Sequence, residues 1–258
     1  LWLPDAFGYS AALPQIMRLA GIEYLVSQKL SWNEINRFPH HTFDWEGIDG
    51  SRVRVHFLPA ETYNNDNAPA GLIAAQERFA QADVSTNWLN PFGVGDGGGG
   101  PSRRHLEFAR RAGDTDGLPR VRMSTATAFL DTIAEIPASR LPLWRGELYL
   151  EKHRGTYTTQ AEIKRLNRRS EQALHDCEFL AVLSGREQRD RLSRVWKSTL
   201  LQQFHDILPG SSIERVNREA RHRMTANLDT VEELASESLS ALFGKEPDIP
   251  ERFVVVNT

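Results

Sequence analysis

The chain has 258 residues with 31 Lys and Arg against 34 Asp and Glu, a net charge of −3 and 40% hydrophobic residues, an ordinary composition for a globular protein. The near-neutral charge argues against nucleic acid as the main partner, because phosphate neutralisation takes a clustered excess of Lys and Arg, and no run approaches the roughly 18 apolar residues of a membrane span. The single cysteine, Cys177, excludes an internal disulfide and favours a reducing compartment such as the cytoplasm.

As far as about residue 160, short apolar runs alternate with Gly, Pro and Asn, which predicts alternating helices and strands. The predicted elements are, in chain order, a helix over 13–19, a buried strand over 22–26, a half-buried strand over 52–57, helices over 71–82 and 102–112, a short strand over 121–123 and a helix over 125–133. This alternation predicts an α/β layered or barrel domain. The connections at 32–50 and 85–101 are long enough to be candidate functional loops.

Beyond residue 160 the apolar residues recur mostly at three- and four-residue steps, the spacing of amphipathic helices. Three helices are predicted, over 163–183, 192–207 and 213–242, ended by Gly185, Pro209-Gly210 and Gly244. Ser211, with Glu214 three residues later, predicts a capping box at the start of the third helix. Short turns between such helices predict an antiparallel three-helix bundle, and the β-branched run at 253–256 predicts a strand.

The first candidate for chemistry is Asp5, which follows Pro4 and precedes Phe7-Gly8 in an apolar and aromatic segment. A carboxylate at the end of a buried strand is well placed to act as a nucleophile or a metal ligand, because low dielectric strengthens its interactions and packing fixes its aim. Aspartate is also a common helix cap, so capping of the helix that follows stays open as the alternative.

The second candidate is Asp96, in the glycine-rich segment 90–101. Three of its glycines match G-x-G-x-x-G, but no strand leads into the segment and the Lys-Ser/Thr ending of a phosphate loop is absent, so the match is weak. Because flexible linkers rarely carry aromatic residues and a lone acid, we predict a backbone that passes close to a ligand, with Asp96 facing it. A plain linker is the alternative.

Two further candidates lie later in the chain. The polar and aromatic segment 146–160 has the hydroxyls, imidazole, guanidinium and rings that suit sugar recognition, or it is an ordinary connection between domains. His205 and Asp206 are placed in the last turn of the second predicted helix, where a metal or a substrate could reach both. A structural or exposed histidine that favours the helix dipole is the alternative.

Taken in order, these four candidates closely resemble α-mannosidases of glycoside hydrolase family 38, in particular the cytosolic and bacterial branch. The resemblance rests on the segments 2–15, 28–34 and 38–43, on the Asp96 loop, on the Tyr157 segment and on Gln203-Phe204-His205-Asp206, and it covers nearly the whole chain. It implies a retaining enzyme that depends on zinc, or on another divalent metal, and hydrolyses terminal α-mannosidic linkages in oligosaccharides or glycans.

The family's catalytic residues carry over where the motifs match. Its Asp in the Asp-x-Phe-Gly motif is both the nucleophile and a zinc ligand, which implies these two roles for Asp5. In a retaining glycosidase a second carboxyl group protonates the departing oxygen. That acid/base role is placed on Asp96.

The family's metal and sugar ligands fall on the second half of the chain. The His of the motif that follows the helices is a further zinc ligand, which implies this role for His205, and the adjacent Asp206 would contact sugar hydroxyls. Tyr157 and Arg154 lie in the segment that resembles the lining of the family's sugar site. Because histidine binds a metal only when neutral, metal affinity is expected to fall in acid.

The resemblance also implies a division into domains. Residues 1–150 would be the C-terminal part of a catalytic α/β barrel, an incomplete (β/α)7-type barrel, residues 151–246 a helical middle domain, and residues 247–258 the start of a C-terminal β domain. The family's zinc site also uses a His-x-Asp pair, and none precedes Asp5. Catalytic zinc takes at least three protein ligands, so we expect an internal segment of an α-mannosidase that is inactive, or nearly so, by itself.

Two alternatives stay open at this stage. One is a related metal-dependent carbohydrate hydrolase of other specificity, and the other is a non-catalytic scaffold or binding module whose helical bundle mediates assembly. The expected partner is a mannose-containing oligosaccharide, with neither nucleic acid nor a membrane, and a homo-oligomer is left open. The mild acidity and the single cysteine fit a cytoplasmic protein that acts on neutral sugars.

Overall fold

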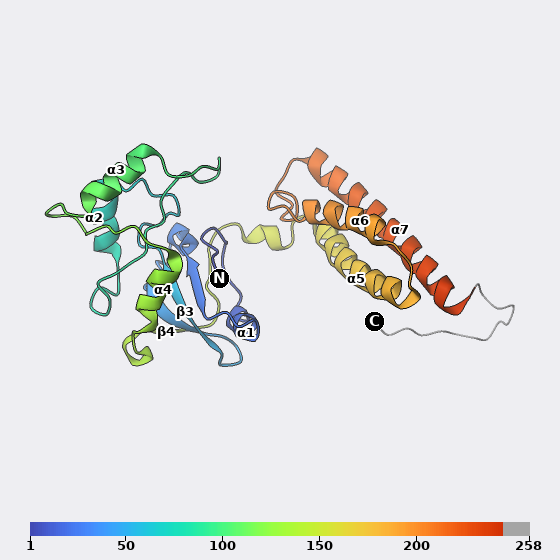
Figure 1. The fold of residues 1–258 in the computed structure, drawn as a ribbon, viewed down its shortest axis with the longest axis horizontal. Coiled ribbons are helices and arrows are strands. Elements are labelled where there is room, and N and C mark those ends of the chain that lie inside the picture. Colours follow the sequence, from blue (N-terminus) through green and yellow to red (C-terminus); the bar gives the residue numbers. More distant parts are fainter. Residues whose placement is uncertain (245–258) are drawn as a thin grey trace. The chain divides into compact units, whose positions relative to one another are not determined.

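The structure is a computed structural model that describes residues 1–244 (Figure 1). The chain divides into two compact units, which we call unit 1, residues Leu1–His153, and unit 2, which begins at Arg154. Each unit is described by itself. The C-terminal β segment predicted over 247–258, with its strand at 253–256, lies outside the described residues.

A small mixed sheet of four strands organises unit 1, in the order β1-β3-β2-β4 (Figure 1). The strands are β1 (Tyr24–Ser27), β2 (Thr42–Glu46), β3 (Arg52–Phe57) and β4 (Leu143–Arg145). β1 and β3 are parallel, β3 and β2 are antiparallel, and β2 and β4 are parallel. The helical elements of this unit are α1 (Leu13–Leu19), η1 (Lys29–Trp32), α2 (Pro69–Arg78), α3 (Arg103–Ala112), α4 (Ala126–Ala134) and η2 (Ala138–Arg140).

The alternating sequence of β3 places its side chains on two faces, as predicted for 52–57. Val55 is fully buried in the core, whereas Arg54 contacts Asp44 of β2 at 2.9 Å. The same guanidinium donates a hydrogen bond of 2.5 Å to the carbonyl of Ile133 in the last turn of α4. Because the last carbonyls of a helix have no partner within it, Arg54 joins the sheet to α4.

Two strands differ from the prediction. β2 lies within the segment 32–50, which is predicted as a long connection, although Thr42–Glu46 alternates polar and apolar residues with period two. The strand predicted over 121–123 is wrong. This segment pairs with no strand within residues 1–244, and Met123 is 57% exposed. The predicted strand at 22–26 begins two residues later, as β1.

The core of unit 1 lies on the sheet, against which α1 packs through β3. Leu25, Phe43, Trp45 and Val55 have no exposed area. Full burial of a large apolar side chain contributes roughly 2 kcal/mol each. This core holds the strand ends that carry the candidate residues.

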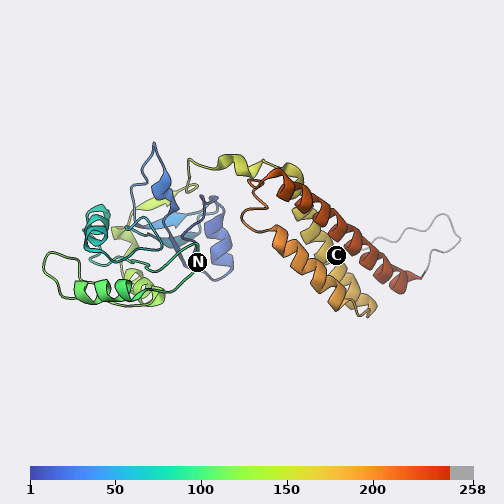
Figure 2. The ribbon, with the colours of Figure 1, turned by 90° about the horizontal axis from the view of Figure 1, so that it is seen from above.

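As far as residue 244, unit 2 contains η3 (Arg154–Tyr157) and three helices, α5 (Ala161–Ser184), α6 (Arg189–Gln202) and α7 (Glu214–Phe243), which lie side by side (Figures 1 and 2). The first half of α5 packs against the first half of α7, where Leu166 and Met224 are buried. Their second halves pack with the start of α6, through Cys177, Leu234 and Leu192. α5 and α7 therefore run in one direction and α6 in the other.

The ends of these helices follow the sequence only in part. α5 ends before Gly185, whose φ of +66° is the left-handed cap that glycine favours. α6 ends at Gln202, earlier than predicted, and the chain continues in turns. The predicted capping box of Ser211 and Glu214 is wrong, because Ile213 occupies the N-cap of α7 and no side chain caps it.

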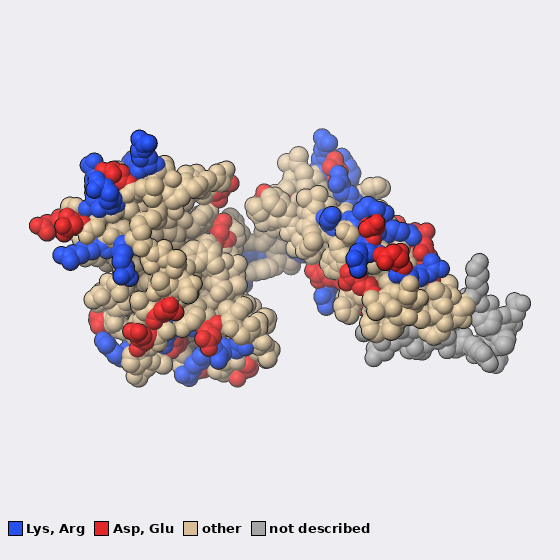
Figure 3. All heavy atoms as spheres, viewed as in Figure 1, with Lys and Arg blue, Asp and Glu red and all other residues tan. Residues whose placement is uncertain are grey.

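The surface of unit 2 mixes both signs of charge. Figure 3 shows Lys and Arg beside Asp and Glu over α6 and α7 on the face that it draws. Arg191 of α6, for example, contacts Glu233 and Glu237 of α7 at 3.0 and 2.9 Å. Among the described residues, no helix is both long enough and apolar enough to cross a membrane.

Candidate active site

The candidate residues of unit 1 follow three extended segments that run parallel to one another. Residues 1–3 lie parallel to β1 and pair with Val26 through two backbone hydrogen bonds of 3.0 Å each, and β1 is parallel to β3. Asp5 follows the first stretch, Lys29 follows β1 and Tyr63 follows β3. Ligands of open α/β sheets bind beyond the carboxyl ends of such strands.

Gly8 and Tyr9, which follow Phe7, fix the conformation of the segment that carries Asp5. Gly8 has φ of +103°, and a Cβ there would lie 3.2 Å from the Leu148 carbonyl oxygen, so only glycine fits without strain. The buried Tyr9 hydroxyl donates a hydrogen bond of 2.6 Å to the Leu3 carbonyl. Burial raises the pKa of Tyr9 to about 12, so this hydroxyl keeps its proton at neutral pH.

Asp5 forms an ion pair with Lys29 of η1. The Lys29 side chain is nearly fully buried, and its ammonium lies 3.3 Å from the ring centre of Trp32 and 4.8 Å from that of Phe7. A buried ammonium needs a counter-charge, and aromatic faces add attraction. The N-cap of α1 is Ala12, so Asp5 does not cap this helix and the alternative interpretation is wrong.

The Tyr63 hydroxyl lies between the two predicted catalytic carboxyl groups. Its oxygen is 2.9 Å from Oδ1 of Asp96 and 3.4 Å from Oδ2 of Asp5. The hydrogen bond to Asp96, followed by burial and the charge of Asp5, raises the pKa of Tyr63 to about 12. Because a hydroxyl has one proton, Tyr63 donates fully to one carboxylate at a time, and a proton on the other carboxyl would complete the pair of hydrogen bonds.

The glycine-rich loop reaches this position by packing on the loop after β3. A Cβ on Gly95 would lie 2.8 Å from both Asn64 and Tyr63, so a side chain there would push the loop away. Phe92 and Asn65 form a backbone bridge that anchors the loop, and Asp96 adopts a left-handed φ of +58°. The close approach predicted for this loop is thus to the chain's own Tyr63 and Asn64.

In the segment 146–160, Glu151 has a structural task that the sequence did not reveal. Its carboxylate accepts backbone N–H bonds of 2.7 to 2.8 Å from Glu34, Ile35 and Asn36, and a fourth bond from the Asn36 side chain. These bonds, first that of Ile35, lower the pKa of Glu151 to about 2. Glu151 therefore holds the loop after η1 in place.

The candidate residues of unit 2 are exposed. His205 and Asp206 lie in the turns after α6 rather than in its last turn, with side chains 79% and 66% exposed and 3.7 Å between Nε2 and Oδ2. The Arg154 guanidinium lies 5.0 Å from the ring centre of Tyr157 within η3. Tyr157 is 59% exposed.

One end of unit 2 brings these two segments together. Gly210, with φ of +76°, lies so close to Thr159 and Gln160 that a Cβ would be 2.8 Å from atoms of both. The Lys164 ammonium donates to the carbonyls of Thr159 at 2.6 Å and Leu208 at 3.1 Å. The turns with His205 are therefore tied to the start of α5, directly after η3.

The sequence analysis named Asp5 and Asp96 but missed Tyr63, which contacts both, and Lys29, which pairs with Asp5. Tyr63 stands in a loop of Asn and Asp residues, and Lys29 follows a short buried strand. Trp32, three residues after Lys29, could have indicated Lys29, because its aromatic ring attracts the ammonium. Tyr63 had no signal in its local sequence, because only the fold brings it beside both carboxyl groups.

Comparison with known families agrees with the resemblance. The model of the glycosyl hydrolases family 38 N-terminal domain matches residues 1–147, and that of the α-mannosidase middle domain matches residues 151–242. The chain belongs to glycoside hydrolase family 38. The first of these matches covers all the candidate residues of unit 1, and the second covers those of unit 2.

Curated relatives of this family 38 chain are named α-mannosidases. It is 43% identical to α-mannosidase 2C1 of Homo sapiens over 100% of the chain and 25% of that protein. It is 46% identical to α-mannosidase G of Dictyostelium discoideum over 83% of the chain and 20% of that protein. The chain thus spans a quarter or less of the length of these relatives.

The fold of the family 38 chain is similar to that of a solved relative. An α-mannosidase from Enterococcus faecalis V583 superposes with a TM-score of 0.67 over 93% of this chain and 29% of that one, at 21% sequence identity. A second Enterococcus faecalis family 38 protein gives a TM-score of 0.60 at 20% identity. At these identities the likeness concerns the fold.

The described part of the family 38 chain does not contain a complete set of zinc ligands. Within residues 1–244, no three His, Cys, Asp or Glu side chains lie close enough together to hold a metal ion, whereas catalytic zinc takes three protein ligands. Asp5 already contacts the Lys29 ammonium, whose charge opposes an added cation. The described residues alone therefore do not fit a catalytic metal.

Proposed function

We propose that this chain supplies the two catalytic carboxyl groups of a retaining α-mannosidase, with Asp5 as the nucleophile and Asp96 as the acid/base. The observation that carries the proposal is the contact of the Tyr63 hydroxyl with both carboxyl groups. One bridging oxygen keeps them close, as in retaining glycosidases, whose carboxyl groups are about 5–5.5 Å apart. The names of the curated relatives support mannose as the sugar.

The reaction follows from these two roles. An Asp5 oxygen bonds to the anomeric carbon of a terminal mannosyl unit while the bond from that carbon to the glycosidic oxygen breaks, and Asp96 gives its proton to the departing oxygen. Asp96 then takes a proton from water, whose oxygen displaces Asp5 from the same carbon. Two inversions return the starting configuration and both carboxyl groups.

Tyr63 and Lys29 prepare the carboxyl groups for these steps. Once Asp96 has lost its proton, the Tyr63 hydroxyl donates to the carboxylate that results. The Lys29 ammonium holds Oδ1 of Asp5, and Oδ2, which lies 3.4 Å from the Tyr63 hydroxyl, is the oxygen that would attack. Trp32, 43% exposed beside Lys29, offers an aromatic face to the sugar ring.

The family resemblance adds the remaining parts of the proposal. Residues 1–150, with the sheet of unit 1, are the C-terminal part of a catalytic α/β barrel, followed by a helical middle domain over 151–246. Arg154, Tyr157 and Asp206 contact sugar hydroxyls. Asp5 and His205 would hold zinc or another divalent cation only together with further ligands that residues 1–244 do not supply, so we expect no turnover from the described residues alone.

The proposed substrates are mannose-containing oligosaccharides or glycans in the cytoplasm. A neutral sugar fits a chain whose net charge is only −3. The free thiol of Cys177 is buried in the core of unit 2, which fits a reducing compartment.

The nucleophile is tested by Asp5→Asn in a polypeptide of its relatives' length that contains this chain. We expect the turnover of an aryl α-mannoside to fall roughly 10³-fold or more, the scale seen when a nucleophile is removed, and a fluorosugar to label Asp5 in the unsubstituted protein. Asp116→Asn, in the exposed loop after α3, is the matched control and should keep full activity. Normal turnover by the Asp5 variant would overturn the proposal.

The bridging hydroxyl is tested by Tyr63→Phe in the same polypeptide. Loss of the donor should lower kcat by roughly 10²-fold, since hydrogen bonds to developing charge act mainly in the transition state, and leave KM nearly unchanged. The control is Tyr24→Phe, because the Tyr24 hydroxyl has no hydrogen-bond partner among residues 1–244. Equal kcat values for the two variants would contradict the role of Tyr63.

A further inference from the structure

Glu151 lies on a segment that is anchored in the core of unit 1, and it binds a loop that is not. Leu148 and Leu150, just before it, have no exposed area, and Leu148 forms a backbone bridge with Tyr9. The residues that Glu151 binds, 34–36, are all exposed. The backbone of this loop therefore depends on its hydrogen bonds rather than on burial.

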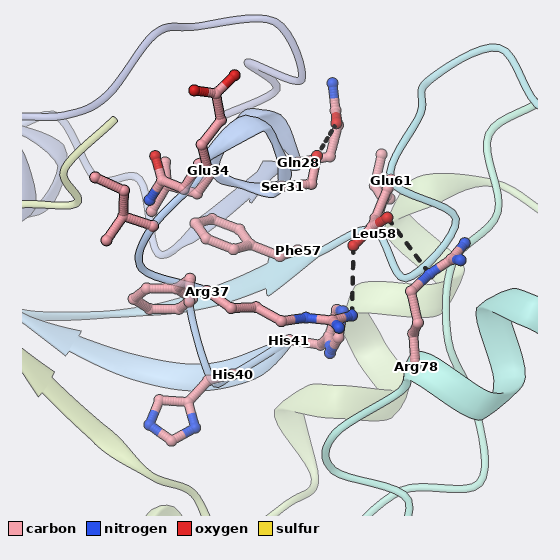
Figure 4. A pocket seen from close by; sticks show the side chains of 14 residues that line it. Gln28, Ser31, Glu34, Arg37, His40, His41, Phe57, Leu58, Glu61 and Arg78 are labelled. Carbon is pink, nitrogen blue, oxygen red and sulfur yellow. Dashed lines mark hydrogen bonds and ion pairs between the residues drawn. The ribbon is translucent and has the colours of Figure 1, made fainter. Parts of the chain in front are cut away.

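A cavity of about 580 Å³ lies along the same loop (Figure 4). Asn33, Glu34, Ile35 and Arg37 are among the residues that line it. Ile35 is 87% exposed, so apolar burial contributes little to holding the loop. Figure 4 shows Arg37 reaching Glu61, at 3.6 Å and with a side chain that is 72% exposed. Such an exposed ion pair contributes little as well.

Both oxygens of the Glu151 carboxylate are used as acceptors for this loop. Oε2 accepts the backbone N–H groups of Glu34 and Ile35 at 2.7 and 2.8 Å. Oε1 accepts the backbone and side-chain N–H groups of Asn36 at 2.8 Å each. A glutamine has the same shape, but its amide nitrogen would face two N–H groups and accept from neither. The arrangement thus requires a carboxylate.

Asn33 connects this arrangement to the end of η1. Its backbone N–H donates to the Leu30 carbonyl at 3.1 Å. Its side chain donates to the Tyr149 carbonyl at 3.1 Å and accepts the Glu151 N–H at 2.9 Å. Because a single 3₁₀ turn does not hold its own shape, the end of η1 takes its position from these contacts.

η1 carries the cation that binds Asp5 and the aromatic ring that covers this cation. The Lys29 ammonium forms the ion pair with Asp5 and lies 3.3 Å from the ring centre of Trp32. Lys29 is nearly fully buried, whereas Trp32 is 43% exposed and directly precedes Asn33. A shift of the backbone at Asn33 would therefore move the Trp32 ring before it moved Lys29.

We propose that Glu151 is a positioning residue for the nucleophile Asp5. It fixes the loop 34–36 and with it the end of η1, so that Trp32 stays over the Lys29 ammonium that holds Asp5. The inference rests on the proposed function, because it takes Asp5 as the nucleophile. The effect of Glu151 passes through η1 and not through the carboxyl pair itself.

Hydrogen exchange tests this link without using activity. The variant is Glu151→Gln, in a polypeptide of the relatives' length that contains this chain, and mass spectrometry with residue-level fragmentation measures exchange. Besides faster exchange over 34–36, we expect the amides of Ser31 and Asn33, which donate within η1, to exchange roughly tenfold faster. Faster exchange over 34–36 alone would overturn the proposal.

The matched control is Glu46→Gln. Glu46 also accepts from two partners, the Arg52 and Arg145 guanidiniums at 2.7 and 2.6 Å. It ends β2, which is antiparallel to β3, and so stands at the opposite edge of the sheet from the candidate site. This variant should leave exchange within η1 unchanged. The same increase in both variants would indicate a general loss of stability and overturn the proposal.

The rate at which a fluorosugar labels Asp5, counted per active molecule, measures the effect on the nucleophile. In Glu151→Gln the saturating rate constant should fall roughly tenfold or more, as for a misplaced reacting group, and in Glu46→Gln it should not change. Glu151→Asp keeps both acceptor oxygens on a shorter side chain, so its rate should be intermediate. A Gln variant that labels as fast as the Asp variant would contradict the role of the carboxylate.

The outcomes also separate this inference from the proposed function. If Asp5→Asn keeps full turnover and no label reaches Asp5, the proposed function fails, and the catalytic part of this inference fails with it. The coupled exchange of the loop and η1 would still be seen in that case. If Asp5 is labelled but Glu151→Gln labels as fast as Glu46→Gln, only the role of Glu151 is refuted.

Discussion

At the scale of single residues, two histidines of unit 1 are held neutral by their surroundings. His56 is fully buried, its Nε2 accepts the Leu89 N–H, and its Nδ1 contacts the Thr42 hydroxyl. Burial, with a smaller effect of His41, lowers the pKa of His56 to about 3. Burial, then the charges of Arg37 and Arg78 and the neighbouring His40, lower the pKa of His41 to about 4.

These two residues predict acid sensitivity. Below pH 6.5, the ordinary pKa of histidine, His41 and His56 take up protons in the unfolded chain but stay neutral in the folded chain. The free energy of unfolding therefore falls as the pH falls. The free energy of unfolding should fall by roughly 1 kcal/mol per pH unit for each histidine, down to about pH 4 for His41. Urea denaturation followed by tryptophan fluorescence measures it, since Trp45 is fully buried in unit 1.

The substitution that isolates one histidine is His41→Gln. The glutamine amide oxygen can still accept the Ala80 N–H, but the side chain does not titrate. The unfolding free energy should therefore depend less steeply on pH between pH 6.5 and pH 4, by about the contribution of one histidine. His175→Gln, at a side chain 73% exposed on α5, should leave the slope unchanged. A slope that is the same in all three proteins would rule out this cause.

At the scale of elements, the sequence predicts correctly those helices and strands whose bounds depend on the local pattern of residues. The helix at 13–19 and the strand at 52–57 have the predicted bounds, and Gly185 ends α5 as expected. β2 is the exception, because Thr42–Glu46 alternates polar and apolar residues with period two and yet lies in a segment predicted as a long connection. The segment 121–123 has strand-like residues but no partner strand within the described chain, and pairing is a tertiary property.

The candidate site shows the same limit at its loops. Asp5 and Asp96 stand out because each is an acid among apolar, aromatic or glycine residues. Their approach depends on Tyr63, which lies 58 residues from Asp5 and 33 from Asp96, and no local pattern encodes such a contact. The close packing of Tyr63 and Asn64 against Gly95 and the anchoring bridge of this loop are likewise visible only in the fold.

The turn between α6 and α7 provides a prediction at this scale. Gly210→Ala introduces a Cβ 2.8 Å from Gln160 at a φ of +76°, so it meets both a collision and backbone strain. We expect a loss of about 3 kcal/mol in the stability of unit 2, by overpacking and by the left-handed conformation together. Thermal and urea unfolding followed by helical circular dichroism measure this loss.

Gly185→Ala is the matched control for that turn. Gly185 also has a left-handed φ, of +66°, but nothing lies within 4 Å of a Cβ built there. It should therefore cost only about 1 kcal/mol, the backbone term alone. Equal losses for the two substitutions would show that the contact of Gly210 with Gln160 contributes nothing to the stability of unit 2.

At the scale of the whole molecule, the proposed roles are divided between the two compact units of the chain. Unit 1 carries the carboxyl pair, the Lys29 ion pair and the additional cavity. Unit 2 carries the exposed His205 and Asp206 at the end where η3 joins α5. Neither unit alone holds all the residues that the family resemblance makes functional, so a substitution in unit 2 can test a reaction whose carboxyl groups are in unit 1.

His205→Ala provides that test, in a polypeptide of the relatives' length that contains this chain. Because neutral imidazole is a common zinc ligand, we expect bound zinc and aryl α-mannoside turnover to fall together by roughly tenfold or more, the scale for loss of a metal-site group. Metal analysis and kinetics on the same preparation measure both. His175→Ala is the matched control, since His175 also precedes an exposed Asp and is 73% exposed, and it should keep zinc and activity. Zinc retained by the His205 variant, with activity intact, would remove unit 2 from the metal site and leave the catalytic proposal to stand on Asp5, Tyr63 and Asp96 alone.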